Sequence, residues 1–320
     1  RLAADGMPAG ADDVLILQGA QQGLDLVAQL LVDPGDVVIT ERPTFLGALI
    51  AFDPYEPRYA TVPTDGDGMD VDALEELLRG WPAGERAPRL VYVVPEFQNP
   101  TGATLSLARR ERLVELAGRF DLVILEDTPY RELRYGGERL PTLRSLAPDG
   151  RVIHLGSFSK ILAPSMRLGW ANAEPDVLAR LALLKTASDT QCSTLNMAAT
   201  SLYLERCDVD AHVARICASY RRKRDLALDA IARWFPSSAR CTRAEGGLFT
   251  WATFPEGFDA AAFMRERMLP EAHVAWVPGE TFFPVRGEPN HARMSFAALP
   301  DERLLAGLER LGALLRDELG

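Results

Sequence analysis

The stretch VIHLGSFSKILAPSMR, residues 152–167, joins an apolar run to a cluster of polar side chains. Its first five residues do not alternate between apolar and polar, which is typical of a strand buried on both faces of a parallel sheet. Two serines and Lys160 follow the run closely, and Arg167 comes seven residues after the lysine. Because open α/β sheets bind ligands beyond the carboxyl ends of their strands, we expect this cluster to lie at a binding site.

Apolar runs of the same kind recur before and after this stretch, with amphipathic segments between them. The predicted strands are residues 37–40, 90–94, 122–126, 152–156 and 168–171, and the predicted helices are residues 21–32, 71–78, 107–119 and 175–185. Strands that alternate with helices form a mostly parallel sheet with right-handed crossovers. The sequence therefore predicts a large α/β domain in three layers, α/β/α.

The pattern changes after about residue 196, where charged helices and short strands replace this alternation. Helices are predicted at residues 209–234, 259–268 and 301–319, and strands at residues 248–252, 273–276 and 293–296. We therefore predict a large domain at residues 1–205 and a smaller α+β domain at residues 206–320. The basic run RRKR at residues 221–224 is interpreted as a solvated helix face rather than a nucleic-acid site.

The composition limits the class of protein. The chain has 320 residues and a net charge of −10, which argues against a surface for nucleic acid or anionic membranes. No apolar run approaches the roughly 18 residues of a membrane span, so no membrane association is expected. The four cysteines show no CxxC spacing and the four histidines no HExxH pair. We therefore expect no metal site, no disulfide framework and a cytoplasmic location.

The beginning of the chain has no targeting pattern. Residue 1 is arginine, and no basic, apolar and small-residue regions of a signal peptide follow it. We interpret residues 1–13 as the tail of a longer chain.

Polar side chains also follow two other predicted strands. Asn99 lies in the turn PEFQNPTG after strand 90–94, and Asp127 and Tyr130 lie in EDTPY after strand 122–126. Parallel strands end at one edge of a sheet, so we expect these groups to meet Lys160 there. A lysine, a carboxylate and a phosphate cup together fit one ligand, pyridoxal 5′-phosphate (PLP). GAQQ, residues 19–22, supplies the helix start that would complete the cup.

Taken together, these stretches resemble a known family. SFSKILAPSMRLGW (157–170), with GAQQ (19–22), ERPTF (41–45), NPTG (99–102) and EDTPY (126–130), is similar to the fold type I enzymes that use PLP. The chain most resembles the class I/II aminotransferases of the 2-aminoadipate and kynurenine aminotransferase subgroup. The aminotransferase-like domain of MocR regulators is related to them. The resemblance implies a three-layer large domain and a smaller C-terminal α+β domain.

The resemblance also implies a role for each matching residue. Lys160 would form the Schiff base with PLP and carry the proton, with Asp127 and Tyr130 as further catalytic residues. Asp127 would pair with the pyridine nitrogen, and Asn99 and Tyr130 would bind the phenolic oxygen. The residues that would hold the phosphate are Ala20, Gln21, Ser157, Ser159 and Arg167. Phe45 would stack on the ring, and Arg293 and Asn99 would bind the substrate.

Three positions depart from the residues usual in the family. Ala20 replaces a serine, Phe45 replaces a tyrosine, and Thr128 replaces the second aspartate of EDDPY. The first change removes one hydroxyl from the phosphate cup, and the second keeps the stacking surface without the phenol. Asp127, the position that matters for the ring nitrogen, is retained.

The activity implied is transfer of an amino group between an L-amino acid and a 2-oxo acid through a Lys160 aldimine. The resemblance also implies a homodimer. Two alternatives stay open. One is the PLP-binding effector domain of a MocR-type transcription regulator, which would sense rather than turn over a ligand. The other is a lyase, racemase or oxidase on the same fold.

Overall fold

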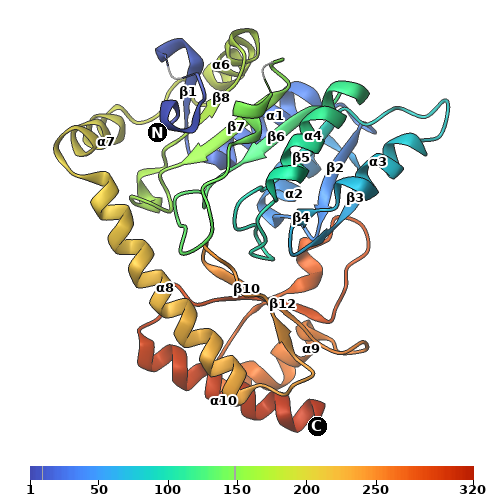
Figure 1. Ribbon diagram of the computed structural model, residues 1–320, viewed down its shortest axis with the longest axis vertical. Helices are drawn as coiled ribbons and strands as arrows, with labels where there is room; N and C mark the ends of the chain where they lie inside the picture. Colours follow the sequence, from blue (N-terminus) through green and yellow to red (C-terminus); the bar gives the residue numbers. More distant parts are fainter. Residues whose placement is uncertain (9, 148) are drawn as a thin grey trace.

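Two β-sheets organise the chain in the computed structural model, which describes residues 1–8, 10–147 and 149–320 (Figure 1). Within these residues, an eight-stranded sheet has the order β1-β8-β7-β6-β5-β2-β3-β4 and a four-stranded sheet the order β11-β12-β10-β9. The strands of the larger sheet are β1 Val14–Leu17, β2 Val37–Arg42, β3 Arg58–Asp65, β4 Gly68–Met69, β5 Leu90–Val93, β6 Val123–Asp127, β7 Val152–Ser157 and β8 Gly169–Asn172. Those of the smaller sheet are β9 Arg240–Cys241, β10 Phe249–Thr253, β11 Val277–Pro278 and β12 His291–Ser295.

The larger sheet is mostly parallel, as predicted. Strands β3, β2, β5, β6 and β7 pair in parallel, whereas β8 runs antiparallel to both β7 and β1, and β4 antiparallel to β3. Only residues 158–168 connect β7 to β8, and parallel neighbours need a crossover of about a dozen residues or more, usually a helix. The short connection therefore reverses β8.

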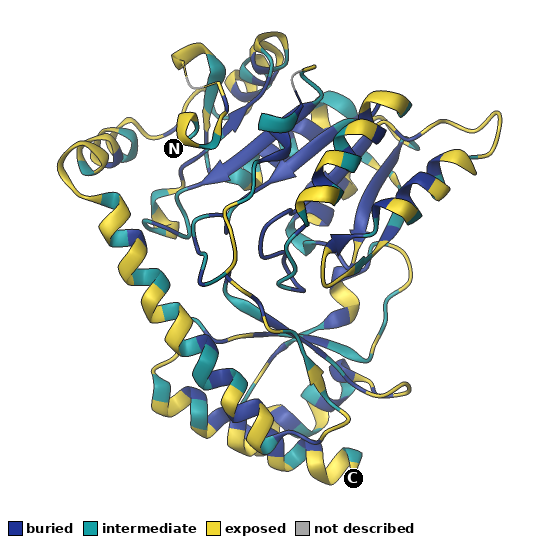
Figure 2. Ribbon diagram, viewed as in Figure 1, coloured by how far each residue is buried: buried dark blue, intermediate teal, exposed yellow. Residues whose placement is uncertain are grey.

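Helices cover both faces of this sheet and complete the three predicted layers. One core packs residues of α1 (Ala20–Leu31), α2 (Leu46–Phe52) and α6 (Pro175–Asp189) against the sheet. The opposite core contains residues of α3 (Val71–Arg79), α4 (Leu107–Phe120) and α5 (Leu143–Leu146). Figure 2 shows the central strands in the colour of buried residues. These non-alternating apolar strands are buried because both of their faces are covered.

The smaller sheet has its own hydrophobic core. Residues of β10, β12 and the helices α8 (Val209–Trp234) and α10 (Asp301–Leu319) meet there, with Phe254, Trp276 and Leu311 buried between them. Both helices have the predicted bounds. Figure 1 shows α8 running from α7 (Thr194–Arg206), at the periphery, down to this second core. This core is distinct from the two on the faces of the larger sheet, and the division into residues 1–205 and 206–320 stays a prediction.

Several elements differ from the prediction. The strand predicted at residues 273–276 is wrong, because His273 has a left-handed φ of 53° and ends a π-helix, so that the strand β11 begins only at Val277. The helix predicted at residues 259–268 is an α-helix, α9 (Ala260–Phe263), that continues as the π-helix η5 (Met264–Ala272). Strands β1 and β3 and helices α2 and α7 were not predicted. Their segments are short, mixed in polarity or largely exposed, so they lack a clear hydrophobic period.

In the residues described, no helix combines the length and the hydropathy needed to cross a membrane. The four cysteines are all free, and Cys192 is buried. Across the same residues, no three histidine, cysteine, aspartate or glutamate side chains converge as metal ligands could.

Candidate active site

The buried carboxylate of Asp127 ends strand β6 with one oxygen satisfied and the other free. The Tyr92 hydroxyl donates to Oδ2 at 3.0 Å, while Oδ1 has no hydrogen-bond partner among the described residues. Burial raises the pKa of Asp127 to about 6, against the opposing effects of the Tyr92 hydrogen bond and the charge of His154. A buried acceptor without a donor is costly. Oδ1 is therefore placed to receive a donor from a bound group.

Asn99 links the end of β5 to the smaller domain. Its Nδ2 donates to the Tyr130 hydroxyl at 3.3 Å, and its Oδ1 accepts a hydrogen bond from Nη1 of Arg293 at 2.8 Å. The Arg293 guanidinium also lies 4.2 Å from the ring centre of Phe249 and 5.0 Å from that of Phe282. No carboxylate of the described chain forms an ion pair with Arg293, and burial lowers the pKa of its guanidinium. The guanidinium is thus left without a counter-ion among the described residues, and a planar anion could supply one.

Lys160 differs from the other two lysines of the chain. Lys185 is paired with Asp189, and Lys223 lies 3.8 Å from Asp301. The Lys160 amine, by contrast, has no hydrogen bond or ion pair with any described residue. Burial, and then the nearby charges of Arg167 and Arg293, lower its pKa. A half-buried amine with a lowered pKa is suited to act as a nucleophile or a general base.

The start of α1 is open to an anion. Its N-cap, Gly19, has a φ of 78° and offers no side chain to cap the first N–H groups. A Cβ on Gly19 would lie 2.9 Å from Nη2 of Arg167, and one on Gly169 would lie 2.8 Å from the backbone nitrogen of Ala20. Both glycines thus allow a close approach that a side chain would block. Uncapped N–H groups, the helix dipole and a guanidinium form an anion site in this arrangement.

The remaining residues predicted for the phosphate cup lie around this helix start. Ser157 is buried at the end of β7, and its Oγ accepts a hydrogen bond from the Ser159 N–H at 3.1 Å. Gln21, on the exposed side, donates from Nε2 to the Gly47 carbonyl at 2.6 Å. The ring of Phe45 packs over Gly47, directly beside Gln21. The structure therefore brings Phe45 to the same helix start, while the roles of these residues remain predictions.

A buried network behind the site was not predicted from the sequence. Glu41, at the end region of β2, accepts hydrogen bonds from the Val94 N–H at 3.1 Å and from Nε2 of Gln98 at 3.2 Å. Burial raises the pKa of Glu41 to about 8, and the charge of Asp127 adds to this, although the two hydrogen bonds oppose it. Near neutral pH Glu41 is therefore mostly protonated, which leaves Asp127 as the anion. The sequence feature that could have identified Glu41 is its place directly after the predicted strand 37–40. Several other site residues also follow predicted strands directly.

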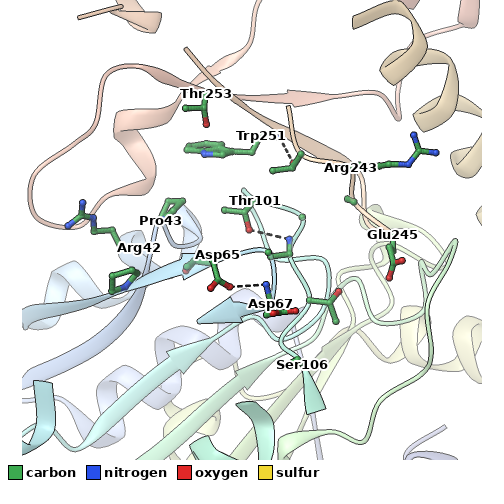
Figure 3. Close-up of a pocket in the computed structure, with 18 of the residues that line it drawn as sticks. Arg42, Pro43, Asp65, Asp67, Thr101, Ser106, Arg243, Glu245, Trp251 and Thr253 are labelled. Atoms are coloured by element: carbon green, nitrogen blue, oxygen red, sulfur yellow. Dashed lines mark hydrogen bonds between the residues drawn. The ribbon is translucent and has the colours of Figure 1, made fainter. Parts of the chain in front are cut away.

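A cavity of about 880 Å³ lies on the far side of the turn that follows Asn99. Its lining includes Thr101 and Gly102 of this turn, but none of the predicted site residues. Figure 3 shows Trp251 and Thr253 on one wall of the cavity, and Asp65 and Asp67 on the opposite side. The predicted cofactor residues therefore lie outside this cavity, after β5, β6 and β7 and at the start of α1.

Comparisons with known proteins agree with this geometry. Residues 4–311 match the family model described as aminotransferase class I and II. The aromatic-amino-acid aminotransferase 1 of Thermococcus litoralis is 40% identical over 98% of this chain and 75% of its own length. The 2-aminoadipate transaminase of Thermus thermophilus is 39% identical over 95% of this chain and 76% of its own.

A solved structure is also similar over the whole chain. The kynurenine aminotransferase of Pyrococcus horikoshii, solved with the pyridoxamine form of the cofactor, superposes with a TM-score of 0.95 and 36% identity. The superposition covers 100% of this chain and 78% of the other. An unpaired lysine, an unsatisfied carboxylate and an open helix start are what such enzymes need to hold PLP. The chain belongs to the class I and II aminotransferases, which depend on this cofactor.

Proposed function

We propose that this aminotransferase moves an amino group between an L-amino acid and a 2-oxo acid through Lys160, Asp127 and Arg293. The observation that carries the assignment is the free amine of Lys160, since each of the other two lysines faces an aspartate. Lys160 also lies close enough to Arg167 and Arg293 for their charges to lower the pKa of its amine. Lys160 is thus the lysine left for covalent chemistry. It lies near Arg167, which would hold the phosphate, and near Arg293, which would bind the substrate carboxylate.

The residues present fit PLP. Asp127 has a buried oxygen without a donor, which suits a protonated ring nitrogen. Asn99 and Tyr130 would bind the phenolic oxygen, and Phe45 would pack on the ring. The phosphate would be held by Ala20, Gln21, Ser157, Ser159 and Arg167. When bound, the cofactor supplies an aldehyde that reacts with amines and a ring that withdraws electrons from the substrate.

Each side chain then has a defined part in the reaction. Lys160 takes the proton from the substrate Cα as a general base and, as a general acid, would deliver it to the carbon that was the aldehyde of the bound cofactor. Asp127 stays ionised beside the cationic ring and stabilises its charge. Arg293 binds the substrate carboxylate through two parallel hydrogen bonds and orients the Cα hydrogen toward Lys160. Its position in the smaller domain lets substrate binding draw that domain over the site and exclude water.

The names of the relatives and the residues near Arg293 point to the class of amino donor. Trp251, Phe282 and Phe283 form a buried aromatic cluster, and Phe282 contacts the Arg293 guanidinium. We propose aromatic and long-chain amino acids as donors. The test incubates the protein with PLP, a panel of amino acids and a 2-oxo acid acceptor, and measures the 2-oxo acid formed from each donor. A regulator would bind PLP without turnover, whereas a lyase, racemase or oxidase would give other products.

The affinity for PLP should depend on pH through Asp127. The pKa of this carboxyl is raised to about 6, chiefly by burial, so it gains a proton as the pH falls through 6 and loses the charge that attracts the ring. We expect affinity, measured by spectroscopic titration, to fall more steeply below pH 6 in the parent than in Asp127→Asn. The cofactor phosphate titrates equally in both proteins, so the difference isolates Asp127. Identical slopes would refute the assigned role.

We propose that the protein is a homodimer, located in the cytoplasm. Helix α7 supports the dimer, because Thr200 is its single buried residue and two leucines seven positions apart on one face, Leu195 and Leu202, are 76% and 46% exposed (Figure 2). An apolar helix face of this kind is typical of a subunit interface. The free cysteines support a reducing compartment.

Sedimentation velocity at micromolar concentration tests the dimer. We expect the parent to sediment as a dimer and Leu195→Asp to shift toward monomer, because a charge would be buried at the interface. Val285→Asp is the matched control, since Val285 is 70% exposed but lies outside α7. A fully active parent that sediments as a monomer would exclude the interface.

A further inference from the structure

A buried histidine lies next to the segment that carries Asp127. His154 on β7 is 2% exposed, and its register partner across the sheet is Glu126, which is fully buried. Side chains alternate along a strand, so Glu126 and Thr128 point to one face of the strand and Asp127 to the other. The two residues that flank Asp127 both contact the ring of His154.

The hydrogen bonds of Glu126 show which group donates between Glu126 and the ring of His154. Oε2 of Glu126 lies 3.1 Å from Nδ1 of His154, and the same carboxylate accepts from the N–H groups of Leu143 and Arg144 at 2.7 and 3.0 Å. Burial pushes the pKa of Glu126 upward, but the hydrogen bond and charge of His154 and the two backbone bonds outweigh it, so the pKa is lowered. Glu126 is thus an ionised acceptor, and Nδ1 carries a proton.

The other ring nitrogen, Nε2, faces the hydroxyl of Thr128. Both the N–H and the Oγ1–H of Thr128 donate to the Leu155 carbonyl at 2.9 Å. The same Oγ1 lies 3.2 Å from Nε2 of His154. Both ring nitrogens of His154 are therefore engaged, Nδ1 by Glu126 and Nε2 by Thr128.

This arrangement acts on Asp127 in two ways. The backbone at Asp127 is fixed between two residues that are themselves tied to β7, which holds Oδ1 in place. The charge of His154 also favours the ionised form of Asp127, and it opposes the burial that raises the pKa of that carboxyl. We infer that His154, held by Glu126 and Thr128, is a positioning residue that keeps Asp127 fixed and ionised for the ring nitrogen of the cofactor. This inference rests on the proposed role of Asp127.

The test compares His154→Phe with the parent in cofactor affinity, visible spectrum of the bound cofactor, kcat and KM. Phenylalanine keeps a ring of similar size and removes both ring nitrogens that contact Glu126 and Thr128. Since a hydrogen bond to a charged group is worth roughly 10- to 100-fold, we expect a loss of that order in kcat and weaker PLP binding. KM for the amino donor should stay near parental, because Arg293 is untouched. His212→Phe, the same change on α8, is the control and should match the parent.

A double variant separates this role from a general loss of structure. If His154 acts through Asp127, His154→Phe changes kcat and PLP affinity little further in an Asp127→Asn background. An equal loss in both backgrounds, or parental behaviour of His154→Phe, overturns the inference. Parental behaviour of Asp127→Asn alone would instead overturn the proposed function. If His154→Phe fails to fold, Thr128→Val removes the hydroxyl that contacts Nε2 at nearly constant volume. A several-fold lower kcat at constant KM supports the inference, and a parental kcat refutes it.

Discussion

Lys160→Ala should lower kcat for amino transfer by at least about 10³-fold, since proton transfer by a positioned side chain alone contributes about 10²–10⁴-fold. The variant also loses the amine that holds the cofactor covalently. We expect PLP still to bind, because the helix start of α1 and Arg167 remain to hold its phosphate. Steady-state turnover with the best amino donor, together with equilibrium dialysis of PLP, measures both effects.

Lys223→Ala is the matched control for this variant. Lys223 lies on α8 and interacts with the Leu299 carbonyl and Asp301, far along the chain from the site. Its loss should leave kcat within about twofold of the parent, as is usual for surface substitutions. If Lys160→Ala kept turnover within tenfold of the parent, the amine of Lys160 would not be the proton carrier.

Arg293→Ala should retain the bound cofactor and lose most of kcat/KM for amino acids. Removing one partner of a buried charge pair costs about 2–5 kcal/mol, or roughly 30- to several-thousand-fold. The loss should appear with every amino donor, because the α-carboxylate is common to them all. Kinetics with a series of donors, and a spectrum of the resting protein, measure the two expectations separately.

Two controls define the contact of Arg293 with the substrate. Arg293→Lys should recover only part of the loss, because an ammonium group cannot make the bidentate contact of a planar guanidinium. Amines without a carboxylate should react at nearly the same rate in all three proteins. A variant that lost PLP while KM for amino acids stayed unchanged would show that Arg293 supports the fold around Asn99 instead.

The sequence was informative about the site because its residues follow apolar runs. Lys160, Asp127 and Asn99 each come shortly after a predicted strand, so the rule that parallel strands end at one edge was enough to group them. The contact between Arg293 and Asn99 joins residues 194 positions apart, and only the folded chain reveals it. Their functional roles still rest on the resemblance, and the variants above test them.

The parts that could not be predicted have physical causes. Tyr92 lies inside an apolar strand, so nothing in the sequence distinguishes its hydroxyl, which donates to Asp127, from that of a core tyrosine. His154 likewise lies inside an apolar strand, and both of its ring nitrogens have partners. Its partners are residues that the sheet register brings beside it, and the register depends on the whole sheet. The reversal of β8 depends on a short connection, and the late start of β11 on the π-helix that ends at His273, rather than on hydrophobic period.

Borohydride reduction of the purified protein with PLP, followed by peptide mapping, tests the central claim most directly. Reduction fixes the cofactor on whichever amine holds it, and the chain has only three lysines to distinguish, at positions 160, 185 and 223. The account predicts a pyridoxyl group on the peptide that contains Lys160 and on no other. A label on Lys185 or Lys223, or none on any lysine, would contradict it.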